Sequence, residues 1–393
     1  MEYKTLGSLV DRKIGYGIVQ PGQNILDGVP VIKVNNLITG LHSKDELDVT
    51  TKENDEKYSR TRLEGGELIV SVVGTVGKTA IVPKSFRGCN LVRAVAMIDI
   101  KENWLSKWVK YYIDSPAGQA YIEQNLNTTV QATLNIKTLV DMPIPFPKED
   151  EMRKIVTILD AIDRKIECDQ QINDNLEQQA ATYFQELFIN NANPVWQIST
   201  ISDLGTVVGG STPSKTKPEY YTNNGIAWIT PKDLSINKSK FISHGENDIT
   251  ELGLKNSSAT VMPKGTVLFS SRAPIGYIAI ASNEVTTNQG FKSVIPYSEI
   301  GTAFVYFFLK HSLPVIESAA SGSTFKEISG SAMKNIPAII PDRNTLDQFN
   351  SFCAPIFAQQ KILEEQNHSL AMLRDSLLPK LMSGAIDIAS IQL

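Results

Sequence analysis

The stretch GGELIVSVVGTVGKTAIV at residues 65–82 returns in related form as KGTVLFSSRAPIGYIAI at residues 264–280. The equivalent positions lie 199 residues apart and are Gly66 with Gly265, Ser71 with Ser270, and Gly77 with Gly276. Further along, TTVQATLNIKTLVDMPIPFP at residues 128–147 matches STFKEISGSAMKNIPAIIP at residues 323–341, with Pro143 over Pro337. Similarity between two parts of one chain on this scale indicates a duplicated structural unit. The sequence therefore predicts one fold that occurs twice.

Length and composition are those of an ordinary globular protein with two or three domains: 393 residues, of which 42% are hydrophobic and 20% charged. No apolar run reaches the roughly 18 residues that a membrane span needs, and the first residues lack the apolar core of a signal peptide. We expect a cytoplasmic protein without membrane contact. The three cysteines and four histidines lack the spacing of a disulfide framework or a zinc site, which predicts three buried, reduced thiols and no metal.

The net charge of −4 is unevenly distributed along the chain. Residues 1–148 and 191–341 each carry +2, whereas residues 149–190 carry −6 and residues 342–393 carry −2. Attraction to phosphate depends on the cations close to it and not on the charge of the whole chain. The two modules are therefore compatible with DNA binding, although the charge alone does not require it.

Both modules combine short β-rich runs with a helical pattern. The first has VPVIKV at 29–34, ELIVSVV at 67–73 and LVRAVAMIDI at 91–100 before the helix-like WLSKWVKYYID at 104–114. The second has IAWIT at 226–230, TVLFSS at 266–271 and FKSVIP at 291–296 before AFVYFFLKHS at 303–312. Runs broken by Gly, Pro and Asn and followed by a helix predict an α+β fold for each module.

A long helix follows each module. From Glu149 to Phe188 there is no Gly or Pro, and apolar residues, Ile172 among them, recur at steps of three and four. A second such pattern begins after PDRNT, passes Pro355, where we expect a kink, and stops at Ser383. Two long amphipathic helices with a module between them predict an antiparallel coiled coil with pseudo-two-fold symmetry. The residues expected to pair the helices are Ile155, Leu159, Ile162, Ile166, Leu176, Leu187, Ile356, Leu363, Leu370, Leu377 and Leu381.

Signatures of catalysis are missing. GTVGKT at 74–79 lacks the first glycine of a phosphate-binding loop, because Val72 stands at that position. The chain contains neither the GxGxxG pattern of a dinucleotide site nor a Pro-Pro pair, which the adenine methyltransferase motif requires. Asp160, Asp163 and Lys165 fall on polar positions of the first long helix, where a solvated face is the simplest interpretation. We predict no catalytic residue, no metal and no cofactor in this chain.

Polar, basic and aromatic residues beside the turns are the types that read DNA. Arginine can bind guanine, asparagine and glutamine can bind adenine, and lysine mostly contacts phosphate. Each such residue on its own is more often a solvated surface residue. The candidate DNA-binding residues are Lys33, Asn35, Asn36, Arg60, Arg62, Lys78, Arg87 and Arg93 in the first module and Lys215, Lys217, Tyr220, Tyr221, Lys232, Arg272, Asn288 and Gln289 in the second.

Two stretches resemble a known family. WQISTISDLGTVVGGSTPSKTKPEYYTNNGIAWITPKDL at 196–234 resembles the opening of a target recognition domain, and LAMLRDSLLPKLMSGAIDI at 370–388 is similar to the closing helix of specificity subunits of type I restriction-modification systems. The resemblance extends over the whole chain in the order of two recognition domains, each followed by a long helix. It divides the chain into a first recognition domain at 1–148, a first spacer helix at 149–190, a second recognition domain at 191–341, and a second spacer helix with the C-terminal tail at 342–393.

The resemblance implies a non-catalytic, sequence-specific subunit that reads a bipartite, asymmetric site on double-stranded DNA. Two methylation subunits would bind the helices and modify adenine with S-adenosylmethionine. Two restriction and motor subunits would cut unmodified DNA with ATP and magnesium. The missing catalytic motifs fit this division of labour.

Three other classes stay open on the sequence. An independent two-module DNA-binding regulator would bind its site without a partner. A catalytic nuclease or methyltransferase would show activity as an isolated chain, and a pure scaffold would give its complex no sequence preference.

Overall fold

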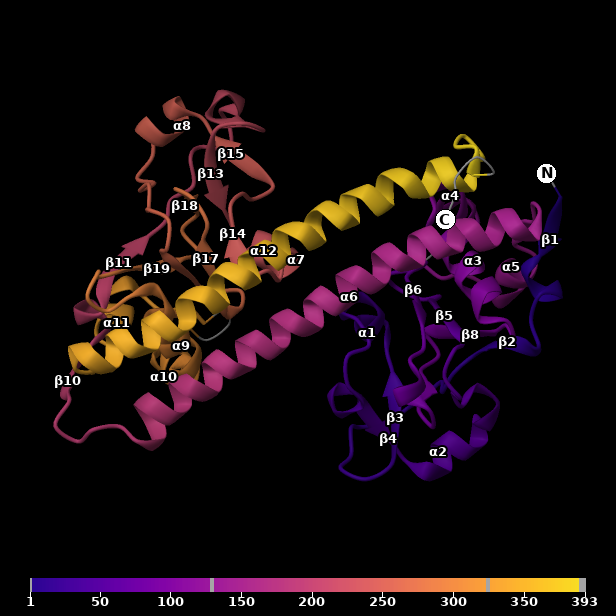
Figure 1. The fold of residues 1–393 in the computed structure, drawn as a ribbon, viewed down its shortest axis with the longest axis horizontal. Helices are drawn as coiled ribbons and strands as arrows, with labels where there is room; N and C mark the ends of the chain where they lie inside the picture. The colour runs from indigo at the N-terminus through magenta and orange to yellow at the C-terminus, as the bar shows by residue number, and fades with distance from the viewer. Residues whose placement is uncertain (1, 128–130, 323–325, 389–393) are drawn as a thin grey trace. The chain divides into compact units, whose positions relative to one another are not determined.

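The computed structural model describes residues 2–127, 131–322 and 326–388. It divides into two compact units, and each is built as a module of mixed α and β structure with segments of two long helices (Figure 1). Unit 1 contains residues 1–166 and 369–393, and unit 2 contains residues 167–368. The predicted α+β class is confirmed.

Unit 1 is organised around a four-stranded sheet in the order β2-β8-β5-β6 and a three-stranded sheet in the order β4-β3-β7, while β1 and β9 form a separate pair. Its strands are β1 (Tyr3–Thr5), β2 (Arg12–Tyr16), β3 (Val29–Ile32), β4 (Asp48–Thr50), β5 (Leu68–Ser71), β6 (Thr79–Ile81), β7 (Asn90–Leu91), β8 (Val95–Asp99) and β9 (Pro143–Pro145). Its short helices are α1 (Val34–Thr39), α2 (Lys52–Lys57), α3 (Asn103–Asp114), α4 (Pro116–Gln124) and α5 (Ile136–Val140).

Unit 2 repeats this plan with a five-stranded sheet in the order β11-β19-β16-β17-β14, a four-stranded sheet in the order β12-β15-β13-β18, and the pair β10-β20. Its strands are β10 (Gln197–Thr200), β11 (Gly205–Gly209), β12 (Tyr221–Thr222), β13 (Ile226–Ile229), β14 (Phe241–Ile242), β15 (Asn247–Ile249), β16 (Val267–Ser271), β17 (Ile275–Ala281), β18 (Thr286–Thr287), β19 (Lys292–Pro296) and β20 (Pro337–Ile340). Its short helices are α7 (Pro231–Ile236), α8 (Glu251–Lys255), α9 (Thr302–His311), α10 (Leu313–Ala319) and α11 (Gly330–Lys334).

The sequence repeat has a direct physical cause in the turn that follows β5 and β16. Gly77 and Gly276 have φ angles of 84° and 96°, which a residue with a Cβ atom rarely adopts. The buried Ser71 hydroxyl accepts a hydrogen bond from the backbone N–H of Lys78 at 2.8 Å, and Ser270 accepts one from Tyr277 at 2.7 Å. The same hydrogen bond and the same left-handed glycine therefore shape the turn in both units.

The second repeat also corresponds to one structure. Asn135 accepts a hydrogen bond at the start of α5, and Ser329 does the same at the start of α11, which is the ordinary role of these residue types at a helix N-cap. The strands that follow, β9 and β20, each pair with the first strand of their unit. Of the quoted repeat, residues 128–130 and 323–325 lie outside the described residues.

The first long helix, α6, is Glu149–Gln185 and continues as a π-helical turn at Glu186–Asn190, while the second, α12, is Arg343–Met382. Pro355 does not interrupt α12, which is helical from Arg343 to Met382. In unit 1, Arg374 of α12 pairs with Asp163 of α6 at 2.9 Å. In unit 2, Gln348 of α12 donates to Tyr183 of α6 at 2.6 Å. Gln360 of α12 also donates to the carbonyl of Asn173 in α6 at 3.1 Å, so the two helices run antiparallel in unit 2, as predicted. Figure 1 shows the same opposite directions for their segments in unit 1.

The residues expected to pair the helices are all buried or half-buried. Ile155, Leu159, Ile356, Leu363 and Leu381 are at most 9% exposed, and the others are half-buried, namely Ile162, Ile166, Leu176, Leu187, Leu370 and Leu377. Ile172 is an error, because its side chain is 41% exposed and its neighbour Asn173 is buried instead. Apolar residues at steps of three and four predict that Ile172 faces inward. Ile166 and Ala180 instead belong to a seven-residue repeat, and the position of that repeat between them is 173, which therefore faces inward.

Two further expectations are wrong. Cys168 is exposed, in contrast to Cys89 and Cys353, because it lies on the solvent side of α6. Asp160 and Asp163 do not lie on a solvated face: Asp160 pairs with Lys107 of α3 and with Arg164, and Asp163 accepts a hydrogen bond from Tyr111 at 2.8 Å. The spacing of polar residues along a helix shows that they share a face, but it does not show whether another element packs against that face.

Candidate nucleic-acid interface

In unit 2, the loop Asn288–Gly290 joins the ends of three strands. Asn288 donates its backbone N–H to the carbonyl of Ile229 at the end of β13, at 3.0 Å, and Gly290 accepts from Ser271 at the end of β16, at 2.8 Å. The Asn288 side chain accepts the Gly290 N–H at 2.8 Å and so closes the loop on itself. A Cβ atom at Gly290 would lie 3.0 Å from Pro231, which makes this approach tight. The loop is therefore fixed by hydrogen bonds of its own backbone and of the Asn288 side chain.

This loop brings together most of the second-module candidates. Ser271 is followed by Arg272, and Pro231 is followed by Lys232, so both cations flank the loop. The segment 211–217 lies against it, because Ser211 donates its N–H to Thr287 at 2.8 Å and the Thr212 hydroxyl donates to Gln289. We call this set the Asn288 surface. It consists of Lys232, Arg272, Asn288, Gln289 and the segment 211–217, which contains Lys215 and Lys217.

Several of these side chains already have partners within unit 2. Arg272 pairs with Glu327 at 3.2 Å, and Lys232 pairs with Glu246 at 2.6 Å. Lys217 donates to the Tyr220 hydroxyl, which raises the pKa of Lys217. These partners are at least partly exposed, so the ion pairs are weak and can exchange for another anion. Lys215 is exposed and has no ion pair with another residue that the structure describes.

The two candidate tyrosines have different roles. Tyr220 is 4% exposed and belongs to the interior of the loop region. The Tyr221 hydroxyl donates to the carbonyl of Pro213 at 2.6 Å, and its ring packs edge-on against Trp228 at a centroid distance of 5.7 Å. Trp228 is 6% exposed, and its indole N–H donates to the Ser211 carbonyl at 3.0 Å. The tyrosines thus hold the segment that presents Lys215.

Sequence reasoning missed Lys292 and Glu327. Lys292 lies 3.6 Å from Glu327, and the same carboxylate pairs with Arg272, so three charged residues from separate segments meet beside the loop. Glu327 also forms an isolated bridge with Arg272 through its backbone. The pairing joins residues far apart in the chain, and no sequence signal marked it.

Unit 1 presents the equivalent place with different side chains. At the start of α1 the Asn36 side chain accepts the backbone N–H of Lys33 at 2.7 Å, and at the start of α7 the Asp233 side chain accepts that of Thr230 at 2.7 Å. Asn35 therefore stands where Lys232 stands in unit 2. In unit 1 the backbone N–H of Val72 donates to the carbonyl of Ala94, and in unit 2 the backbone N–H of Ser271 donates to the carbonyl of Gly290. Ala94 is therefore equivalent to Gly290, and the residues before them, Arg93 and Gln289, occupy equivalent positions.

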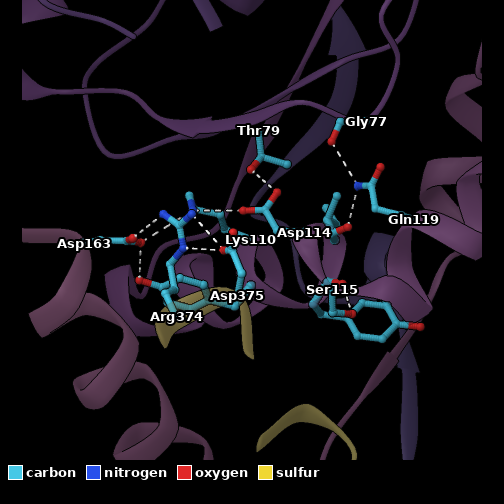
Figure 2. A network of polar contacts seen from close by, with 12 residues as sticks. Gly77, Thr79, Lys110, Asp114, Ser115, Gln119, Asp163, Arg374 and Asp375 are labelled. Atoms are coloured by element: carbon cyan, nitrogen blue, oxygen red, sulfur yellow. Dashed lines mark hydrogen bonds and ion pairs between the residues drawn. The ribbon is translucent and has the colours of Figure 1, made fainter. Parts of the chain in front are cut away.

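Lys78 lies on the duplicated turn after β5, and both of its neighbours are fixed (Figure 2). The Gly77 carbonyl accepts from Gln119 of α4 at 3.1 Å, and the Thr79 hydroxyl donates to Asp114 of α3 at 2.5 Å. Asp114 in turn pairs with Lys110 at 2.9 Å. Figure 2 shows that the same network reaches Asp163 of α6 and Arg374 of α12. The Lys78 side chain is exposed, so it extends from a rigid support.

The remaining first-module candidates lie elsewhere. Arg62 binds Asp55 and Glu56, and these hydrogen bonds raise the pKa of Arg62 above its ordinary value. Arg87, 74% exposed, pairs with Glu64, and Lys33 pairs with Asp48. Arg60 is exposed and lines a groove of unit 1.

No group of three or more His, Cys, Asp or Glu side chains among residues 2–127, 131–322 and 326–388 is arranged to hold a metal ion. In the same part of the chain, none of the helices combines the length and the apolar character that crossing a bilayer requires.

The fold and the loops define a class of protein. It is a duplicated α+β protein whose two units share one backbone fold but carry different polar side chains at equivalent positions. The chain belongs to the family of the type I restriction modification DNA specificity domain, whose sequence model matches residues 3–178 and again residues 194–367.

Named relatives agree with this assignment. The chain is 43% identical over 162 residues to the type I restriction enzyme MjaIX specificity subunit of Methanocaldococcus jannaschii, a match that covers 41% of this chain and 37% of the relative. It is 28% identical over 194 residues to the HindI specificity subunit of Haemophilus influenzae, with 49% and 42% covered. The match thus spans about two fifths of the length of these relatives. A solved type I S subunit from M. genitalium has a similar fold, with a TM-score of 0.58 at 16% identity over 97% of this chain and 95% of that one.

Proposed function

We propose that this chain is the sequence-specific DNA-binding subunit of a type I restriction-modification complex. One observation carries the proposal: the two units offer different polar residues at the same backbone position, Asn35 and Arg93 in unit 1 and Lys232 and Gln289 in unit 2. Direct readout of bases needs such donors and acceptors on a fixed scaffold. Two different surfaces on one repeated scaffold suit a target of two unlike halves.

The domain limits follow from this function. Residues 1–148 and 191–341 would be the recognition domains, and residues 149–190 and 342–393 would be the spacer helices and tail. Two methylation subunits would dock on the helices, and two restriction and motor subunits would complete the complex. S-adenosylmethionine, ATP and magnesium would belong to those partners, and this chain would contribute no catalytic group. A cytoplasmic location fits this role.

The experiment is to co-express the chain with the methylation subunit of its own system and to map methylated adenines across the host genome. We expect one bipartite, asymmetric target, which disappears when the chain is omitted. The purified chain alone should transfer no methyl group. A methylation pattern that is the same with and without the chain would refute the proposal, and methyl transfer by the chain alone would refute its non-catalytic part.

A further inference from the structure

A groove of about 610 Å³ opens in unit 1 beside the edge of its larger sheet. Residues from three separate segments line it: Arg12, Lys13, Ile14, Gly15, Tyr16, Lys57, Tyr58, Arg60, Thr61 and Ile136. Four of them are cations and two are tyrosines, and none of the described residues that line the groove is acidic. Such a lining favours an extended anionic ligand.

Two of the four cations are available for a ligand. Arg12 pairs with Asp99 and, at 3.0 Å, with the buried Glu67, and Lys57 pairs with Glu53 at 2.8 Å. Lys13 and Arg60 are exposed and have no ion pair with any other residue that the structure describes. Their charge is therefore not neutralised within the described protein.

The segment that carries Arg60 is rigid. The Tyr58 carbonyl accepts from the Thr61 hydroxyl at 3.0 Å and from the Asn90 side chain at 3.2 Å. Asn90 is fully buried and also donates to Asp55 at 2.8 Å. Because the backbone on both sides of Arg60 is held by these buried hydrogen bonds, ordering it around a ligand costs little entropy.

The opposite wall comes from the edge strand β2. Among the described strands, it pairs only with β8, and its register shifts between Arg12 and Gly15, which marks a bulge. A bulge at a sheet edge redirects side chains and leaves backbone groups unpaired. Tyr16 is 46% exposed at this edge, and neither its hydroxyl nor that of Tyr58 bonds to another described side chain or carbonyl. Tyrosine hydroxyls and cations are the usual ligands of DNA phosphates.

One wall of the groove continues into the segment beside the candidate residue Arg93. Two residues after Tyr16, the carbonyl of Ile18 accepts the backbone N–H of Arg93 at 2.8 Å. Arg93 is the residue that stands in the place of Gln289 in unit 2. A strand held in the groove would therefore continue onto the surface that carries Arg93.

The fold does not require these cations, as unit 2 demonstrates. Leu63 bonds through its backbone to Gly88 and Cys89, just before β7, and Met262 bonds to Val285, just before β18. The offset of 199 residues that joins Gly66 to Gly265 also joins Leu63 to Met262, and it places Ala259 where Arg60 stands. Strand β11, the counterpart of β2, reads GTVVG and carries no charge. The basic lining is thus a property of unit 1 alone.

We infer that this groove binds the sugar-phosphate backbone of DNA and that Lys13 and Arg60 contact phosphates. The inference rests on the proposed function, since it names the part of unit 1 that holds the DNA strand without reading its sequence. Phosphate contacts position a protein on DNA and weaken with salt, whereas base contacts set the sequence.

The test uses the complete complex with its methylation subunit and a duplex that carries the mapped target. The variant is Lys13→Gln/Arg60→Gln, and the matched control is Lys52→Gln/Lys101→Gln, which removes two exposed positive charges of unit 1 outside the groove. We expect the groove variant to bind DNA about tenfold or more weakly for each phosphate that is no longer bound. The slope of log K against log salt should become shallower by about 0.9 for each such phosphate, and the methylated sequence should stay the same.

Two results would overturn the inference. One is a groove variant that matches the control in affinity and salt slope; the other is a changed half-site, which would mean that the groove reads bases. Either result leaves the proposed function intact, because wild-type complex would still bind its target. Failure of the wild-type complex to bind any specific duplex would instead refute the proposed function.

Discussion

Lys240 is the most unusual residue in unit 2, because it is a buried cation between the module and the two long helices. Its side chain is 6% exposed, pairs with Glu177 of α6 and donates to Gln360 of α12 at 2.6 Å. Its backbone N–H and that of Phe241 bind Glu364 at 2.7 and 3.0 Å. Burial lowers the pKa of Lys240. The network satisfies its charge with hydrogen bonds, which is what makes a buried ion tolerable.

The contributions of the two glutamates of this network to folding stability should change with pH in opposite directions. Burial disfavours the charged form of both, yet the charges of Lys240 and Lys310 lower the pKa of Glu177, whereas burial dominates at Glu364 and raises its pKa. Stability from Glu177 is full above its unfolded pKa of about 4.3 and is lost as pH falls through its lower folded pKa. Stability from Glu364 is full below that unfolded pKa and is lost as pH rises through its higher folded pKa.

We therefore predict that Glu177→Gln is less stable than wild type at pH 7 and that this deficit shrinks on acidification. For Glu364→Gln, stability relative to wild type should improve as pH rises from about 4 to 7. Urea unfolding of each variant from about pH 3 to pH 7 measures both differences, since the Glu177 contribution changes only below its unfolded pKa of about 4.3. Differences that change with pH in the same direction would contradict the assignment of the two pKa shifts.

At the scale of the element, α12 shows that one face of a long helix can mix apolar and polar contacts. Its positions at seven-residue steps toward α6 include Gln360 and Arg374, which are polar. Gln360 is 3% exposed and donates to the carbonyl of Asn173 in α6 at 3.1 Å. A buried polar residue in a helix pair fixes the alignment of the two helices at some cost in stability. The apolar positions between them supply the packing.

Adjacent residues of α12 give a matched pair for testing that packing. Leu363 is 4% exposed and Ile362 is 47% exposed. We predict that Leu363→Ala lowers the free energy of unfolding by about 2–5 kcal/mol, because it leaves a cavity, and that Ile362→Ala changes it by about 0.5 kcal/mol or less. Urea unfolding followed by circular dichroism distinguishes the two. Equal effects would mean that the inward face of α12 is assigned incorrectly.

At the scale of the whole chain, each unit has its own hydrophobic clusters and its own sheets. The candidate reading residues of one unit are therefore supported by contacts within that unit. A substitution on one surface should leave the other surface unaltered.

We predict that Arg272→Ala changes the sequence preference in one half of the methylated target and leaves the other half unchanged. A correct base contact provides about 1–3 kcal/mol of discrimination. Lys264→Ala is the control, because Lys264 is exposed and precedes the opposite end of β16. Genome-wide mapping of methylated adenines in cells with each variant gives the answer. A change in both halves, or in neither, would show that Arg272 does not read bases of one half-site.

The sequence by itself determined the duplication, the α+β class, the long helices and the family. These depend on local requirements that leave a pattern in the chain, such as glycine at positive φ in Gly77 and Gly276 and apolar residues at helical spacing.

Only the tertiary structure decided which polar residues meet. Arg62 and Arg60 are equally basic in the sequence, yet Arg62 is bound by Asp55 whereas Arg60 is exposed in a groove with Lys13, a residue that no sequence pattern indicated. Likewise, Arg272 and Asn288 lie on one surface because the backbone of Gly290 bonds to Ser271. Contacts between loops of distant segments decide which of these polar residues lie together. A loop leaves no periodic pattern in the sequence, so these contacts cannot be predicted from it.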